Sequence, residues 1–352
     1  MRADLALVGF GHVGQRFARL IAEQADTLRT AHDLEPRIVG IATRRHGSVY
    51  AEEGIDVERA LADIAAGRYL HGLDGLKGAH AGLSPADLLQ RLGSASSPLR
   101  VLVETTTLAI EDGQPATLHI EAAIDAGCHA VTANKGPVAF AYRRLRDRAA
   151  AAGVSFLFEG AVMDGVPVFN LVRETMPAVT VLGFRGVVNS TTNHILTALE
   201  DGEAFAPALA RMQAEGIAEA DASLDVDAWD AAAKAAALAN VLMNAELTPH
   251  AVDRIGIGPE TAGPAREALL RGSRIRLVAS GGRDGSGRVV AAVRPVELSR
   301  DDLLSGLRGT ANALILQTDL LGDVAIHQLG GGLTATAYAL LSDLIAIRRR
   351  ER

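Results

Sequence analysis

The chain has 352 residues, a formal net charge of −7 and a single cysteine, Cys128. The acidic balance argues against nucleic acid as a partner, the lone cysteine excludes an internal disulfide, and no apolar run is long enough to cross a membrane. The length predicts two domains, and because 48% of the residues are hydrophobic and only 4% are aromatic, we expect their cores to be aliphatic. Without a membrane-spanning run or a secretion signal, we expect a cytoplasmic protein.

The first half of the chain alternates strands with helices. Strands are predicted at residues 4–8, 37–42, 101–103 and 130–132, and helices at 13–21, 115–126 and 138–152. A loop-rich stretch is expected from about 67 to 98. This alternation is typical of an α/β fold with a Rossmann-like, doubly wound parallel sheet.

The second half is expected to be α+β. Strands are predicted at 154–159, 181–188, 275–279 and 289–293, helices at 193–200, 204–215 and 229–244, and a hairpin loop at 281–287. A final helix at 333–347 is apolar enough to pack on the body of the protein. We therefore predict a dinucleotide-binding domain at 1–137, on which residues from about 320 to 352 pack, and a substrate-binding and dimerisation domain at 138–319.

A glycine-rich turn joins the first strand to the first helix, in the order Gly9-Phe10-Gly11-His12-Val13-Gly14. In such a turn Gly9 permits the tight bend, Gly11 lets a pyrophosphate approach the backbone, and Gly14 lets helix and strand pack closely. The helix N-terminus then offers N–H groups to the phosphates. The sequence predicts a dinucleotide site here, with His12 beside the phosphates and not in catalysis.

The end of the second strand indicates which dinucleotide is bound. Enzymes that use NAD commonly carry an acidic residue there, whereas this chain has Thr43-Arg44-Arg45. The missing carboxylate and the paired arginines favour NADP, and NAD remains the alternative because surface arginines are frequent in this chain.

Lysine is rare, with only three among the 35 basic residues, and two of the three lie among residues that carry chemistry. Lys234 follows Asp230 by one helical turn, in a helix of alanine and leucine that we expect to be buried. A buried lysine needs carboxylate partners, and this chain supplies several nearby, namely Glu219, Asp221, Asp225, Asp227 and Asp230.

Lys135 follows the strand at 130–132, at the carboxyl edge of the predicted sheet, where such sheets bind their ligands. Asn134 and Lys135 are therefore expected near the nicotinamide end of the dinucleotide. Hydride reduction of an aldehyde builds negative charge on its oxygen, and a lysine can both stabilise that charge and donate a proton.

These motifs together resemble the homoserine dehydrogenase family. The resemblance runs along most of the chain, through residues 9–14, 103–106, 127–135, 159–167, 189–193, 219–234 and 330–335. It implies NAD(P)H-dependent, reversible reduction of L-aspartate 4-semialdehyde to L-homoserine, a step in threonine and methionine biosynthesis, by a homodimer. The form that it resembles is short and stands alone, without a kinase or regulatory domain.

The resemblance also implies roles for individual residues. Lys135 and Lys234 would be the catalytic pair, one donating the proton and the other orienting the oxygen. The substrate would be held by Glu219, Asp225, Asp230 and Thr191, and the cofactor also by Thr105, Thr106, Asn134 and Lys135. A sodium ion would lie on the segment with Glu159, Val162 and Asp164, because hard oxygen donors suit it.

Two positions depart from the family pattern. Ser190 stands where glycine is usual, and Asp164 stands where a small residue is common. They leave room for a related amino-acid or semialdehyde dehydrogenase as an alternative. A second alternative is a non-catalytic dinucleotide-sensing protein, which would be expected to have lost the lysines and carboxylates that this chain retains.

Overall fold

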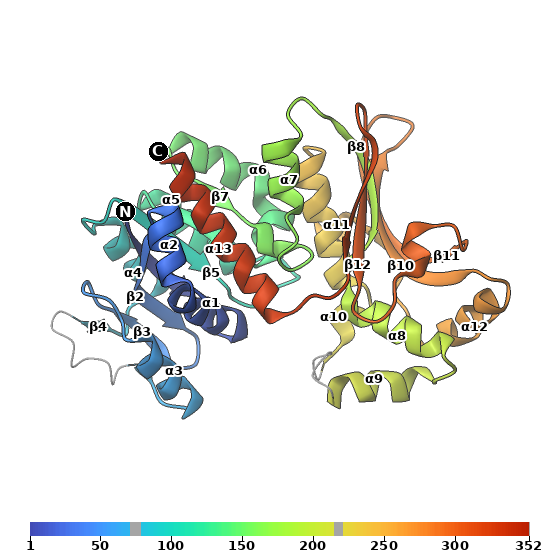
Figure 1. Ribbon diagram of the computed structural model, residues 1–352, viewed down its shortest axis with the longest axis horizontal. Coiled ribbons are helices and arrows are strands. Elements are labelled where there is room, and N and C mark those ends of the chain that lie inside the picture. Colours follow the sequence, from blue (N-terminus) through green and yellow to red (C-terminus); the bar gives the residue numbers. More distant parts are fainter. Residues whose placement is uncertain (71–78, 215–220, 352) are drawn as a thin grey trace. The chain divides into compact units, whose positions relative to one another are not determined.

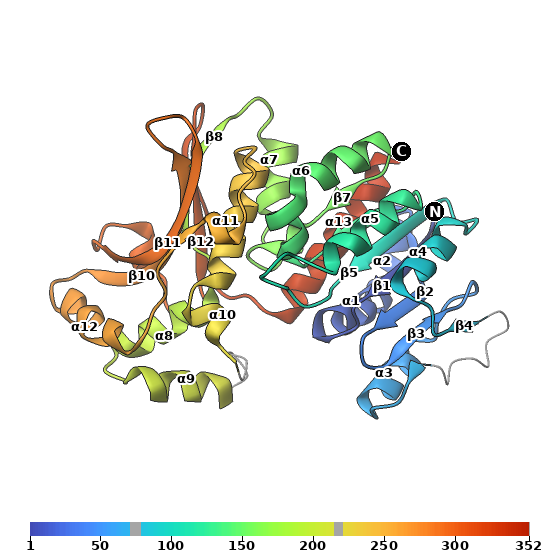
Figure 2. The same ribbon diagram turned by 180° about the vertical axis from the view of Figure 1, so that it is seen from behind.

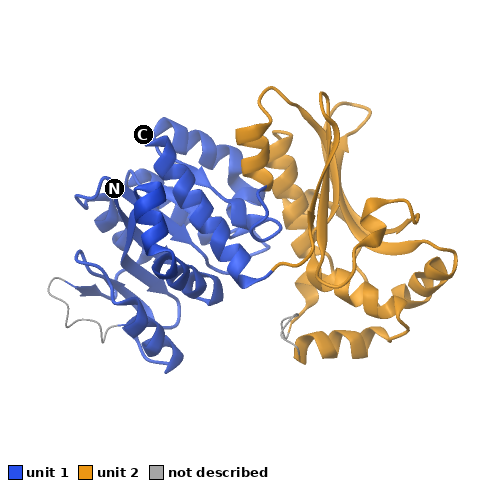
Figure 3. Ribbon diagram, in the orientation of Figure 1, with its two compact units in different colours: residues 1–167, 332–352 blue, residues 168–331 orange. Residues whose placement is uncertain are grey.

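The computed structural model describes residues 1–70, 79–214 and 221–351. The chain folds into two compact units (Figure 3). Unit 1 comprises Met1–Pro167 and Gly332–Arg352, and unit 2 comprises Val168–Gly331, so that unit 2 is an insertion in unit 1. No helix in the described ranges has the length and apolar character needed to cross a membrane.

Unit 1 is built on a seven-stranded sheet in the order β4-β3-β2-β1-β5-β6-β7. The strands β2, β1, β5, β6 and β7 run parallel to one another, and β3 and then β4 extend the edge next to β2 as antiparallel strands. The strands are β1 (Arg2–Val8), β2 (Glu35–Thr43), β3 (Gly47–Tyr50), β4 (His80–Ala81), β5 (Leu99–Glu104), β6 (His129–Thr132) and β7 (Phe156–Leu157). The predicted Rossmann-like fold class is confirmed.

Helices cover both faces of this sheet (Figures 1 and 2). On one face lie α1 (His12–Glu23), α2 (Ala25–His32) and α13 (Leu333–Arg350), and on the other lie α4 (Pro85–Gly93), α5 (Ala116–Asp125) and α6 (Lys135–Ala151). A further helix, α3 (Val57–Ala65), precedes the undescribed residues 71–78. The two-sided cover explains why β1 and β5 consist almost wholly of buried residues.

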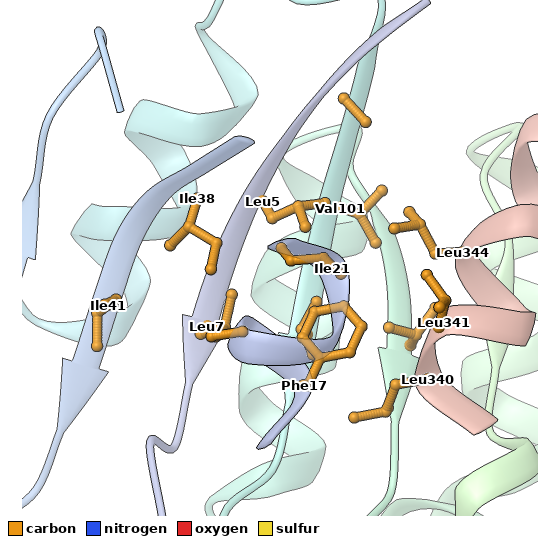
Figure 4. Packing of buried hydrophobic residues seen from close by; sticks show 14 of the residues in the cluster. Leu5, Leu7, Phe17, Ile21, Ile38, Ile41, Val101, Leu340, Leu341 and Leu344 are labelled. Atoms are coloured by element: carbon orange, nitrogen blue, oxygen red, sulfur yellow. The ribbon is translucent and has the colours of Figure 1, made fainter. Parts of the chain in front are cut away.

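The core under α1 joins segments from both ends of the sequence (Figure 4). Leu5 and Leu7 of β1 point toward Phe17 of α1, and Leu340 and Leu344 of α13 complete the cluster. All five side chains are fully buried. The prediction that the final helix packs on the dinucleotide-binding domain agrees with this cluster.

Several sequence predictions for unit 1 were wrong. The stretch expected as loop from 67 to 98 contains α4, which Ser84 caps by accepting from the Asp87 N–H at 3.1 Å, with Pro85 in its first turn. The strand predicted at 154–159 is only the two residues of β7, followed by a 3₁₀ turn over Glu159–Ala161. Helices α2 and α3 and strands β3 and β4 were not predicted.

Unit 2 is built on a six-stranded sheet in the order β13-β12-β8-β10-β11-β9, which is antiparallel except for the β11–β9 pair. Its strands are β8 (Val181–Val187), β9 (Asp253–Arg254), β10 (Arg274–Arg283), β11 (Val289–Leu298), β12 (Asn312–Thr318) and β13 (Gly322–Gln328). The expected hairpin between 281 and 287 is tighter, because β10 continues to Arg283.

The helices of unit 2 are α7 (Val168–Thr175), α8 (Ser190–Glu200), α9 (Phe205–Ala214), α10 (Ser223–Val226), α11 (Trp229–Leu242) and α12 (Ala262–Leu270). Helix α11 packs on β10 and β11, and its alanines from Ala231 to Ala239 are buried. The expectation that Lys234 lies in a buried helix is confirmed. Helices α7, α10 and α12 and strands β9, β12 and β13 were not predicted.

The boundaries of the two units differ from the predicted domains. The predicted division fell at 137/138, whereas unit 1 continues to Pro167, because β7 pairs with β6 and α6 packs on α5. The predicted returning segment began at about 320. In the structure β13 pairs with β12 in unit 2, and the chain re-enters unit 1 at Gly332.

Candidate active site

The glycine turn after β1 has the geometry that its spacing predicts. Gly9 has φ of 91°, and a Cβ there would lie 2.5 Å from the Thr105 carbonyl carbon. A Cβ on Gly14 would lie 2.8 Å from the Gly9 oxygen, so this glycine permits close packing of α1 on the turn. Among the described residues, apart from Gly11 itself and its chain neighbours, no atom lies within 4 Å of the Gly11 Cβ position. Gly11 therefore leaves open space at the helix N-terminus.

The first turn of α1 suits a phosphate. Its N-cap is Gly11, and no side chain caps the helix, so its terminal N–H groups stay available to an anion. His12 is exposed at this end, whereas Phe10 is 4% exposed and belongs to the core. Val13 is partly buried against the same core. These residues fit a pyrophosphate that is held mainly by main-chain groups.

A buried carboxylate organises the carboxyl ends of the next two strands. Glu104 ends β5, is fully buried, and accepts from the Thr106 N–H at 3.0 Å, from the Thr106 hydroxyl and from the Thr132 hydroxyl at 2.8 Å. Thr105 donates through its hydroxyl to the Gly9 oxygen at 2.8 Å. The predicted cofactor residues Thr105 and Thr106 are thereby fixed beside the glycine turn.

Asn134 links this network to α6. Its amide nitrogen donates to the Thr106 oxygen at 3.0 Å, and its amide oxygen caps α6 by accepting from the Gly136 N–H at 2.9 Å. Its main-chain N–H donates to the Thr132 hydroxyl at 2.9 Å. The start of α6 at Lys135 is therefore fixed by the hydrogen bonds that join Asn134 to Thr106, Thr132 and Gly136. Lys135 is partly buried.

The predicted 2′-phosphate residues lie in the turn between β2 and β3. Arg44 and Arg45 are exposed, and neither forms an ion pair with any residue that the structure describes. The Thr43 hydroxyl accepts from the His46 N–H at 2.8 Å and donates to the Gly47 oxygen at 3.2 Å, which shapes the turn. Two guanidinium groups are thus presented to solvent at the end of β2.

In unit 2 the Lys234 ammonium contacts a main-chain carbonyl and a carboxylate of residues that the structure describes. It donates to the Val188 carbonyl at 2.7 Å and pairs with Asp230 at 2.9 Å, one helical turn away on α11. Both side chains are only 16% exposed, so this is not a solvated surface pair. The predicted association of Lys234 with Asp230 is confirmed.

Asn189 joins the carboxylates of this pocket and was not singled out from the sequence. Its amide nitrogen donates to Asp225 at 2.7 Å and to Asp230 at 2.9 Å. Its amide oxygen caps α8 by accepting from the Thr192 N–H at 2.8 Å. The helix was predicted to begin at residue 193, whereas α8 begins at Ser190. An asparagine four residues before the predicted start is a recognised type of N-cap residue, and placing the start of the helix there could have drawn attention to this position.

In this pocket the Asp225 carboxylate, next to Asp230, is disfavoured as a negatively charged group. Burial, and then the neighbouring Asp230 carboxylate, raise the pKa of Asp225 above its ordinary value. Hydrogen bonds from Asn189 and Thr191 and the charge of Lys234 act in the opposite direction on this pKa. A substrate ammonium would relieve the repulsion between the two carboxylates. Glu219, the other predicted ammonium ligand, lies outside the described residues.

The predicted cation segment is buried in unit 1. Glu159 is 2% exposed and Val162 is 1% exposed, and the Glu159 N–H donates to Asp343 at 2.8 Å. The Asp164 carboxylate instead accepts from the Gly332 N–H at 3.1 Å and from the Thr336 hydroxyl at 3.2 Å, at the N-terminus of α13. In residues 1–70, 79–214 and 221–351 there is no cluster of three His, Cys, Asp or Glu side chains suited to a metal ion.

Ser190, which stands where the family usually has glycine, turns its hydroxyl toward β12. It donates to the Thr310 oxygen at 3.2 Å and accepts from the Asn312 amide at 2.9 Å. The hydroxyl is therefore occupied by contacts within unit 2.

Comparisons with known proteins cover nearly the whole chain. The family model for homoserine dehydrogenase matches residues 167–345, and that for the homoserine dehydrogenase NAD binding domain matches residues 9–159. The chain is 36% identical to the NAD(+)-dependent homoserine dehydrogenase of Pseudomonas canavaninivorans, over 98% of this chain and 96% of that protein. It is 34% identical to the homoserine dehydrogenase of Methanocaldococcus jannaschii, over 98% of each.

Solved structures agree with these sequence matches. A homoserine dehydrogenase from Thiobacillus denitrificans superposes with a TM-score of 0.82 at 26% identity, covering 100% of this chain and 74% of that one. A hyperthermophilic archaeal homoserine dehydrogenase in complex with NADPH has a TM-score of 0.77 at 26% identity, covering 99% and 98%.

Proposed function

The chain belongs to the homoserine dehydrogenase family, as an NAD(P)-dependent oxidoreductase that acts on a CH–OH group, and we propose that Lys135 and Lys234 are its catalytic residues. The reaction is the reversible reduction of L-aspartate 4-semialdehyde to L-homoserine. The observation that carries the proposal is the Lys234 ammonium, 16% exposed and held by Asp230 and the Val188 carbonyl.

The lysines stabilise and then neutralise the negative charge that develops on the substrate oxygen. When bound, NAD(P)H supplies a hydride to the aldehyde carbon. One lysine ammonium donates a proton to the resulting alkoxide oxygen and becomes neutral, and the other lysine orients that oxygen. In the oxidative direction the neutral lysine accepts the hydroxyl proton of homoserine. Asp230 positions Lys234 through the 2.9 Å ion pair.

The carboxylates recognise the amino group of the substrate. Asp225 and Glu219 bind its ammonium, and Thr191 with its main-chain neighbours meets its α-carboxylate. The raised pKa of Asp225, caused first by burial, supports this role, because a carboxylate in such a pocket gains most from a cationic partner. A semialdehyde that lacks the amino group is therefore a poor substrate.

NADP is the proposed coenzyme, with NAD as the alternative. Arg44 and Arg45 are exposed at the end of β2, where no carboxylate precedes them to bind a ribose hydroxyl. The named relatives include both types, since the Pseudomonas protein is NAD(+)-dependent and the archaeal structure holds NADPH. The remaining cofactor contacts are those of Gly9–Gly14, Thr105, Thr106, Asn134 and Lys135.

A sodium ion is proposed on the segment with Glu159, Val162 and Asp164. Because the Asp164 carboxylate is bonded to Gly332 and Thr336, this residue would contribute its main-chain carbonyl. Hard oxygen donors suit a monovalent cation, which would serve the structure.

The assembly and the cellular setting follow the family. We propose a cytoplasmic homodimer in threonine and methionine biosynthesis. Apolar side chains that are about half exposed or more on unit 2, such as Leu182, Leu320 and Leu321, support an interface there. Light scattering of the purified protein gives the mass that tests the dimer.

One assay tests the reaction and the coenzyme together. Purified protein is incubated with L-homoserine and either NADP or NAD, and absorbance at the reduced-nicotinamide band is followed. Homoserine-dependent reduction that is faster with NADP is the expected result. In the Arg44→Ser and Arg45→Ser double variant the KM for NADP should rise while that for NAD stays unchanged. Equal loss with both coenzymes would contradict the NADP proposal.

A further inference from the structure

The segment between the two site carboxylates, residues 226–229, is held from outside by the chain at 254–257. Arg254 lies on β9, which pairs with β11 at the edge of the sheet of unit 2. Its guanidinium lies 3.4 Å from the centroid of the Trp229 ring, and it donates to the Asp227 carbonyl at 2.6 Å. One arginine therefore contacts both the ring that opens α11 and the backbone that follows α10.

The neighbours of Arg254 hold the same segment. The Ile257 N–H donates to the Val226 carbonyl at 2.8 Å. At Gly256 a Cβ would lie 2.1 Å from the Val226 oxygen, so only glycine permits this close approach. Ala228, within the held segment, has φ of 63°, a conformation that costs free energy for alanine and persists only where its surroundings fix it.

The held segment sets the separation of Asp225 and Asp230. Asp225 precedes it and Asp230 follows it, and both must stay within reach of the single Asn189 amide, at 2.7 and 2.9 Å. Helix α10 has only four residues and cannot fix Asp225 by itself. A change in the 226–229 backbone would therefore move Asp225 away from Asn189, while helix α8 and its Asn189 cap would stay in place.

We propose that Arg254 is a positioning residue for the substrate pocket: by stacking on Trp229 and bonding to the Asp227 carbonyl, it fixes Asp225 relative to Asp230. The inference rests on the proposed function of those carboxylates. Arginine suits this role better than lysine, because its planar guanidinium stacks on the ring and donates in the plane at the same time.

The test compares Arg254→Met and Arg254→Lys with the wild-type enzyme. In Arg254→Met we expect the KM for homoserine to rise about fivefold or more, with kcat changed less and the dissociation constant of the coenzyme within about twofold of wild type. Arg254→Lys keeps the charge and loses the planar stack, so its KM should lie between the two. If Arg254→Met does not fold, Arg254→Lys carries the comparison.

Fluorescence gives an independent signature. Trp229 is the sole tryptophan of the chain, so its emission reports directly on loss of the stacked guanidinium. Arg288→Met is the matched control, since Arg288 lies in the β10–β11 hairpin with a side chain that is 79% exposed. The control should change neither the emission nor the KM.

Two results would overturn the proposal for different reasons. A changed Trp229 emission with an unchanged KM for homoserine in Arg254→Met would mean that the stack serves only the fold. Asp225→Asn, measured in parallel, tests the pocket itself. If Asp225→Asn leaves the KM unchanged, the assignment of the carboxylates is wrong, and the proposal for Arg254 fails with it.

Discussion

Replacing Asn189 by aspartate should break the candidate substrate pocket while keeping the helix cap. Asparagine and aspartate have the same shape, and the oxygen that accepts from the Thr192 N–H at 2.8 Å is present in both. The amide nitrogen that donates to Asp225 and Asp230 becomes a second oxygen. Asn189→Asp therefore places a third carboxylate against two others.

The structure gives the scale of the effect. A hydrogen bond to a charged group contributes about 1.5–3 kcal/mol, and two such bonds are lost. Asp230 keeps Lys234 as a partner, and its side chain is 16% exposed. The low end of the range therefore applies, which gives a loss of about 3 kcal/mol in the free energy of unfolding of unit 2. Asn189→Ser is the matched control, because it removes both donors and adds no charge.

The loss in Asn189→Asp should depend on pH. Burial, and then Asp230, already raise the pKa of Asp225 in the folded protein. A carboxyl group with a raised pKa favours the folded state when protonated, so its contribution falls as the pH rises from its ordinary pKa through the raised one. The deficit relative to wild type should be large at about pH 7 and smaller at about pH 5.

Urea unfolding followed by Trp229 fluorescence measures this deficit in unit 2, and the homoserine assay gives the KM at the same pH values. The KM should rise more in Asn189→Asp than in Asn189→Ser. Equal stability of the two variants at both pH values would refute the argument, because it would mean that Asn189 does not separate charged carboxylates.

Three further changes test other parts of the site. Lys234→Met should lower kcat by about 10²-fold or more while coenzyme binding, measured by titration, stays at the wild-type value; substantial remaining turnover would exclude Lys234 from catalysis. Glu104→Gln should weaken coenzyme binding and lower the thermal midpoint, because the amide cannot accept from both Thr106 and Thr132. Asp164→Ala should lower stability by about 1 kcal/mol through loss of its contacts at α13, with any sodium dependence of activity retained; loss of that dependence would show that the carboxylate binds the ion.

The sequence was sufficient where local patterns alone determine the structure. The strand β1, the turn at Gly9–Gly14 and helix α1 follow from an apolar run, three spaced glycines and helical periodicity. The Asp230–Lys234 pair follows from i, i+4 spacing on an alanine-rich helix. Helix α4 also carried a local signal, the Ser84 cap with Pro85 behind it, which composition rich in glycine and serine masked.

Other features depend on contacts that no local pattern contains. Asn189 meets Asp225 and Asp230 across 36 and 41 residues of sequence, so its central place in the pocket was not predictable from spacing. Glu104 reaches Thr132 across 28 residues, by way of the pairing of β5 with β6. Strand β12 was missed because an apolar run of its length does not distinguish strand from helix, and β13 was missed because it is mostly exposed and has no apolar run.

The return of α13 to unit 1 has a consequence for the newly made protein. The buried face of α1 around Phe17 is closed by Leu340, Leu341, Leu344 and Ile347. On the ribosome, all of residues 168–331 are joined to the chain before any of those four side chains is added. Unit 1 therefore cannot bury the apolar face of α1 until residues 332–352 have been synthesised, although its first 167 residues are made before unit 2 begins, and partly folded chains that expose such apolar surface are prone to aggregate.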